Sequence, residues 1–114
     1  MSFFNSDVVR AEMTEISELQ EDVYRNIFNF PSMNTQEQLF HVAMLEKLLD
    51  KQKILFARLS LSDDPEAKKM KEKIIESATM MGLPQGGDLS TVFNNMSSML
   101  QLMKKQIDSN EKDQ

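Results

Sequence analysis

Residues 34–59, NTQEQLFHVAMLEKLLDKQKILFARL, decide the fold of this chain. Asn34 and Glu37 stand three residues apart, the spacing of a capping box, so a helix is predicted to begin at residue 35. Apolar side chains then recur every three or four residues in two adjoining rows. One row holds Val42, Leu45, Leu49, Phe56 and Leu59, and the other holds His41, Leu48, Gln52 and Leu55. We therefore expect a helix over 35–59 that faces two neighbours.

The stretch before it has the pattern of a second long helix. Apolar residues recur at spacings of three, four and seven over residues 7–29, after a plausible cap at Ser6. Leu19, Tyr24 and Phe28 are expected to widen the apolar face of this helix. Pro31 is expected to end it, because the residue before a proline is pushed out of the α region.

Two further helices are predicted in the second half. Asp64 is a suitable cap, and Pro65 occupies the first helical position, where its missing N–H costs nothing. A helix over 65–81 follows and stops at Gly82. The most regular apolar period of the chain then predicts a last helix over 89–108.

These elements predict an all-α fold. Short connections between four helices imply antiparallel neighbours, so helices 7–29 and 35–59 should form a long hairpin on which the other two pack. The chain is expected to fold as one domain over 1–108. Residues 109–114 are polar and are expected to form a flexible tail.

Composition limits the classes of function. The 114 residues carry a net charge of −5, which disfavours binding to nucleic acid. The charge is uneven: residues 1–30 are acidic and residues 31–60 slightly basic, so the first segment is expected to lie against the second. No apolar run approaches the ~20 residues of a membrane span. Without cysteine or a recognisable signal peptide, the expected location is the cytoplasm.

Few residues could carry chemistry. Glu37 and His41 lie one helical turn apart and could begin a metal site that Asp63 and Asp64 complete. The alternative reading, which we adopt, makes His41 a partly buried helix residue and the aspartates caps. No serine has the surroundings of a nucleophile, and the 82–87 segment lacks the lysine of a phosphate loop. The sequence therefore predicts no metal, no cofactor and no enzymatic activity.

Methionine is the distinctive residue, with ten in the chain. It is flexible and polarizable, which suits both irregular cores and surfaces that adapt to a partner. Met70 and Met81 are expected to lie in the core. Four residues of the last helix are the predicted partner-binding residues: Phe93, Met96, Met99 and Met103.

Three stretches carry a family resemblance: residues 3–9 (FFNSDVV), 44–49 (MLEKLL) and 59–67 (LSLSDDPEA). On these, the chain resembles a family of short cyanobacterial and cyanophage proteins of unknown function. Residues 80–84 (MMGLP) and 93–96 (FNNM) resemble the phage branch more closely. The resemblance implies a virus-encoded or host-encoded cytosolic protein and brings no functional residues.

The sequence thus predicts a non-enzymatic protein–protein interaction module, oligomeric and active in a phage context. Its partner is another protein or a second copy, with no role for nucleic acid or membrane. Two alternatives stay open. One is a phage assembly chaperone or small virion component, and the other is an acidic inhibitor that docks residues 1–30 on a basic host protein.

Overall fold

The computed structural model describes residues 2–80, 82 and 89–112. In that part of the chain there are four α-helices, two 3₁₀ segments and no strand, which confirms the all-α prediction. The elements are η1 (Phe3–Asn5), α1 (Asp7–Asn26), η2 (Ile27–Ser32), α2 (Thr35–Leu61), α3 (Pro65–Met80) and α4 (Leu89–Lys112).

The helix ends differ more from the prediction than the starts do. α4 continues to Lys112, past the expected end at residue 108, so the predicted tail over 109–114 is helical as far as it is described. The predicted helix end at residue 81, the rest of the connection over 83–88 and the last residues, 113–114, lie outside the described residues.

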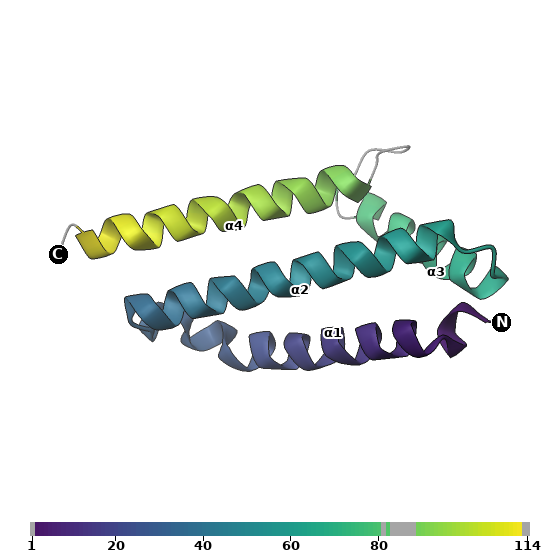
Figure 1. The fold of residues 1–114 in the computed structure, drawn as a ribbon. Coiled ribbons are helices and arrows are strands. Elements are labelled where there is room, and N and C mark those ends of the chain that lie inside the picture. Colours follow the sequence, from purple (N-terminus) through teal and green to yellow (C-terminus); the bar gives the residue numbers. More distant parts are fainter. Residues whose placement is uncertain (1, 81, 83–88, 113–114) are drawn as a thin grey trace.

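α2 is the central element. It packs against α1, α3 and α4, whereas α1 and α4 lie on two sides of it without packing extensively on each other in the described part. Figure 1 shows α1, α2 and α4 running side by side, with α3 at the end where α2 finishes. The predicted hairpin of the first two helices, with the others packed on it, is therefore present.

Two of the predicted caps are made by side chains. The Asn34 side chain accepts a hydrogen bond from the Glu37 backbone N–H at 2.9 Å, which satisfies a free donor in the first turn of α2. Asp64 accepts one from the Glu66 N–H at 3.1 Å at the start of α3. Ser6 occupies the cap position of α1 with extended backbone angles, but its side chain makes no capping bond.

The end of α1 needs a correction. The α-helix stops at Asn26 and a 3₁₀ segment that contains Pro31 follows, instead of helix to residue 29. A proline ring clashes with the carbonyl four residues earlier, here that of Ile27, so the α form ends where the clash begins. Phe28 of this tighter segment is 91% exposed, and Tyr24, which lies in the last turn of α1 before the segment begins, is 67% exposed. Tyr24 and Phe28 therefore do not widen the apolar face, whereas Leu19 does, since it packs against the core.

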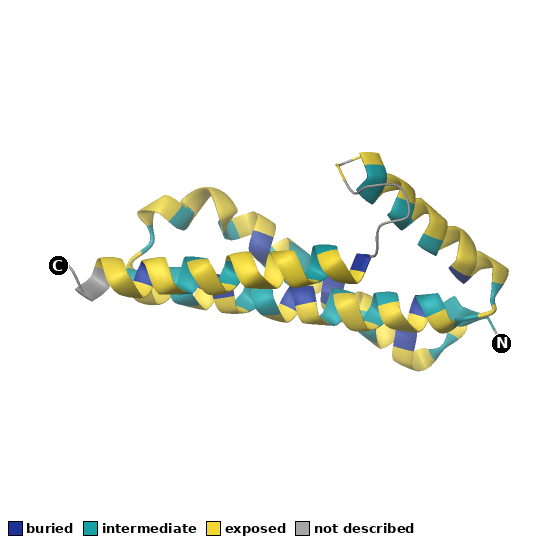
Figure 2. Cartoon of the chain, turned by 90° about the horizontal axis from the view of Figure 1, so that it is seen from above, coloured by how far each residue is buried: buried dark blue, intermediate teal, exposed yellow. Residues whose placement is uncertain are grey.

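The core is narrow. Ile16 and Val23 of α1 pack with Leu48 of α2, and Val42 is fully enclosed. Met70, expected in the core, is 40% exposed, since α3 packs on α2 at one end and on η1, and is not covered by a long helix as α2 is. Figure 2 shows a few buried positions along helices whose other residues are intermediate or exposed.

The molecule is extended for its size. It measures 55 × 32 × 19 Å, and its radius of gyration is 16.6 Å, against about 13 Å for a compact domain of this length. Its accessible surface is 8354 Å², where a folded monomer of 13.2 kDa exposes about 6,400 Å². The chain therefore leaves more surface uncovered than a compact monomer does, and this surface includes large apolar side chains such as Phe28, Leu61 and Met80.

Candidate functional site

The predicted partner-binding residues lie along one flank of α4. Met96, Met99 and Met103 line a cavity of about 180 Å³ between α4 and α2, where they face Leu45 and Leu48. Their contact with α2 is incomplete, since Met96 is 45% and Met99 63% exposed, while Met103 is half-buried. We call these three residues the methionine stripe. The methionine stripe is partly packed against α2 and partly exposed at the surface.

Phe93 occupies a different position from the stripe. Its ring lies 6.0 Å from that of Phe56 on α2, centroid to centroid, in a tilted arrangement typical of aromatic pairs. Phe93 also lines a second cavity, of about 380 Å³, bounded by η1, α1, α2 and α3. The fourth predicted residue is thus half-buried in a packed aromatic contact, and the stripe carries the open surface.

The two cavities share one wall residue. Gln52 of α2 lines both, and the remaining lining is almost entirely apolar. Besides Gln52, Phe56 and Phe93, the second cavity is lined by Phe3 and Phe4 of η1, Met13 and Ile16 of α1, Leu55 and Leu59 of α2, and Met70 and Ile74 of α3. A chain of apolar hollows therefore follows α2 along the side that faces the stripe.

Polar contacts fix the opposite flank of α4. Lys104 forms an ion pair with Glu46 of α2, and the Gln101 side chain donates a hydrogen bond to the same carboxylate at 3.1 Å. These contacts add to the packing of the buried Leu89 and Ile107, which turns that face of α4 inward. Since Glu46 holds one flank, the methionine stripe is kept on the other.

The acidic α1 is paired with basic residues of α2, as predicted. Glu12 meets Arg58 at 2.9 Å, and Glu15 pairs with Lys51. The hydrogen bond and charge of Lys51 hold the pKa of the Glu15 carboxyl below its ordinary value. Part of the negative charge of residues 1–30 is therefore compensated within the chain.

Sequence reasoning missed an aromatic surface around the junction of α1 and α2. Phe28 and Tyr24 are exposed, and Phe40 of α2 is 68% exposed. Their periodicity resembles that of core positions. The change to 3₁₀ geometry at Ile27 removes Phe28 from the interface, whereas Tyr24 is exposed within α1 itself.

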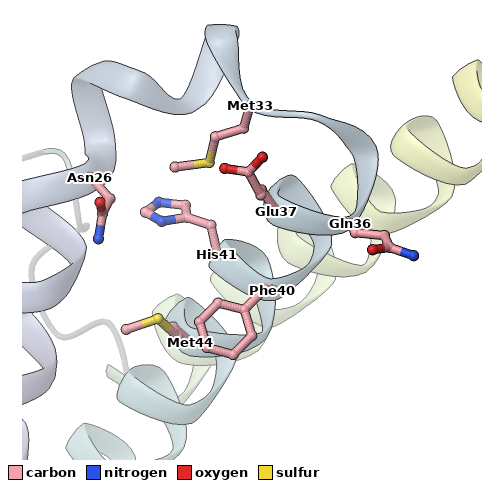
Figure 3. A pocket seen from close by; sticks show the side chains of 7 residues that line it. All are labelled: Asn26, Met33, Gln36, Glu37, Phe40, His41 and Met44. Carbon is pink, nitrogen blue, oxygen red and sulfur yellow. The ribbon is translucent and has the colours of Figure 1, made fainter.

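His41 lies near this junction, in a pocket of about 370 Å³. The pocket also has Asn26, Met33, Gln36, Glu37, Phe40 and Met44 in its lining (Figure 3). His41 itself is buried, with only 4% exposed, and its ring lies 5.5 Å from that of Phe30. It is more enclosed than the partly buried position expected from sequence.

The aspartates weighed as partners of His41 lie at the other end of α2. Asp64 accepts hydrogen bonds from the backbone N–H groups of Phe3 and Glu66, which lower the pKa of its carboxyl. It therefore joins η1 to the start of α3, the structural reading adopted above. No group of three or more histidine, cysteine, aspartate or glutamate residues in the described part could hold a metal ion.

Among the described helices, none combines the length and apolar character of a membrane span. Comparison with curated proteins and with solved structures gives no significant match. The family model described as "Domain of unknown function (DUF1825)" matches residues 1–107, nearly the whole chain. The chain therefore belongs to the DUF1825 family, a family of unknown function.

Proposed function

We propose that this protein is a non-enzymatic interaction module that self-associates through the methionine stripe of α4. The observation that carries the proposal is the exposure of apolar side chains beside an apolar hollow. Met96 and Met99 are 45% and 63% exposed, and Leu102 on the same helix is 58% exposed. Clustered apolar exposure of this kind marks interaction sites on soluble proteins.

The area of the molecule supports association. Its accessible surface exceeds that of a compact monomer of equal mass by about 1,900 Å². A standard interface buries about 800 Å² on each partner. A second copy that lies along α2 between α1 and α4 and buries this much surface would cover less than half of the area difference of about 1,900 Å². Closed two-fold dimers are the commonest assemblies of soluble chains, and one patch serves both copies.

The ion pairs and hydrogen bonds of several acidic residues support a non-enzymatic role. Glu12, Glu15 and Glu46 are held in ion pairs, and Asp64 serves as a cap and a link to η1. Acid–base catalysis needs titratable groups in unlike environments within one site. The same pairing makes an acidic mimic of nucleic acid the weaker alternative, because α1 already has cationic partners.

The cyanobacterial or cyanophage setting, with a cytoplasmic location, is part of this proposal and rests on the sequence motifs quoted above. Within that setting the stripe offers an adaptable surface. Methionine-rich surfaces can repack around different partners.

Light scattering coupled to size exclusion, at micromolar protein concentrations, tests the proposal. We expect a dimer or larger species for the natural chain. Replacing Met96 and Met103 by glutamate should give a folded monomer, because burying two unpaired carboxylates in an apolar contact is strongly unfavourable. Met80→Glu, at an 84% exposed methionine of α3, is the matched control and should leave association unchanged. A natural chain that is strictly monomeric, with a double variant that stays soluble and folded, contradicts the proposal.

A further inference from the structure

His41 is a buried polar side chain without a polar partner. It is 96% enclosed, and neither ring nitrogen has a hydrogen bond to any residue in the described part of the chain. Among the described residues, the buried side-chain polar atom without a partner is Glu12 Oε2, so the ring nitrogens of His41 are not sealed off but open on the adjoining pocket. The ring contact with Phe30 accounts for its packing but satisfies neither nitrogen. The open pocket beside it, of about 370 Å³, has room for a ligand.

Two thioethers share this pocket with the imidazole. Met33 follows η2, and Met44 lies one turn beyond His41 on α2. Figure 3 shows their sulfur atoms on either side of the His41 ring, with the Glu37 carboxylate on the Met33 side. Three elements of the fold converge here, since the carboxamide of Asn26 at the end of α1 completes the wall.

The donor set indicates the ligand. Thioether sulfur is a soft ligand that selects Cu(I), and imidazole binds copper well. Zinc sites use thiolate, several imidazoles or carboxylates in a tetrahedral set, and this chain has no cysteine and a single histidine. Glu37 adds one negative charge near a monovalent cation without having to coordinate it.

We propose that His41, Met33 and Met44 form a binding site for one soft monovalent cation of the Cu(I) class. The imidazole is fixed by burial between Phe30 and the pocket, so it provides the rigid ligand. Each methionine side chain has three rotatable bonds, which allow its sulfur to move onto an ion held by His41. No change of oxidation state is involved, and the site is separate from the methionine stripe.

Ag(I), an air-stable cation of the same class, is the probe for the test. Protein carrying ¹³C-labelled methionine methyl groups is titrated with Ag(I) and followed by NMR. We expect saturation at one equivalent, with shifts confined to two methyl signals that Met33→Leu and Met44→Leu assign by their loss. Each leucine variant should weaken Ag(I) binding at least about tenfold. A loss of that size already follows when a residue that merely orients a metal ligand is removed, and these residues are proposed as ligands.

The stripe supplies the matched control, because it has three methionines and no histidine. Replacing Met96, Met99 and Met103 by leucine should leave the Ag(I) affinity and stoichiometry unchanged. Thermal unfolding of each variant checks that leucine preserves the fold. The proposal is overturned if Ag(I) does not bind at one equivalent, or if the stripe variant loses binding. It is also overturned if Zn²⁺ competes with Ag(I) at equal affinity and its binding is unchanged by both leucine substitutions. That result would indicate a site made by His41 and Glu37 instead.

Discussion

Met99→Ala is the sharpest test of the interaction surface. Met99 is the most exposed member of the methionine stripe, with 63% of its surface accessible, so its truncation removes little from the folded monomer. In a self-associated state the same side chain becomes buried. We therefore expect a large effect on association and a small one, within about 0.5 kcal/mol, on the free energy of unfolding of the monomer.

The size of the effect follows from the exposed fraction. Burying a whole methionine side chain contributes about 1.5–3 kcal/mol. With 63% still available for burial, Met99 can contribute about 1–2 kcal/mol in each copy. A symmetric dimer carries the substitution twice, so the loss is about 2–4 kcal/mol. The dissociation constant should rise by about 30- to 700-fold.

Sedimentation equilibrium over a concentration series measures this dissociation constant. Met80→Ala is the control: Met80 is 84% exposed on α3, so the two substitutions delete the same side chain from surfaces of similar exposure. The control should change the constant by less than about twofold, a free-energy difference near 0.4 kcal/mol. The reasoning is refuted if both variants weaken association equally, or if Met99→Ala leaves the constant unchanged.

Three further substitutions test the fold. Val42→Ala opens a cavity at a fully buried position and should lower the free energy of unfolding by about 2 kcal/mol in urea titrations. Asn34→Ala removes the side-chain cap of α2 and should lower it by about 1 kcal/mol, with reduced helicity by circular dichroism. The pKa of Asp64 is lowered by the Phe3 and Glu66 N–H groups, so its stabilising effect is present above the unfolded-state pKa and is lost as pH falls through the folded-state value. The natural chain should therefore lose stability between about pH 5 and pH 3. Asp64→Asn should make this loss smaller, and thermal unfolding at the two pH values measures it.

Local signals in the sequence were sufficient for most of the architecture. Caps at Asn34 and Asp64 depend on a side chain and a backbone N–H two or three residues away, so spacing alone predicts them. The double apolar row of α2 reflects its two long neighbours, α1 and α4. The ion pairs of Glu12 and Glu15 with α2 follow from net charge and an antiparallel hairpin.

The exposure of apolar residues was harder to predict. Periodicity tells which residues share a helix face, but it does not tell whether anything covers that face. Met70 has core spacing yet is 40% exposed, since α3 meets only one end of α2. Phe28 has core spacing in an ideal helix, and the clash of Pro31 with the Ile27 carbonyl changes the geometry before it.

The pocket of His41 shows why a ligand set can be invisible in sequence. Glu37, His41 and Met44 share one helix at spacings of four and three, so their common face is readable from the sequence. Met33 is not on that helix: it directly follows η2, a segment for which the sequence predicts an ordinary helix end, and it lines the pocket from there. Metal sites are usually sought in a sequence through oxygen, nitrogen and thiolate ligands, so the thioether sulfurs of Met33 and Met44 do not attract notice. The 3₁₀ segment that contains Pro31 therefore accompanies two departures from the helical pattern: Phe28 within it is exposed, and Met33 directly after it lines the pocket of His41.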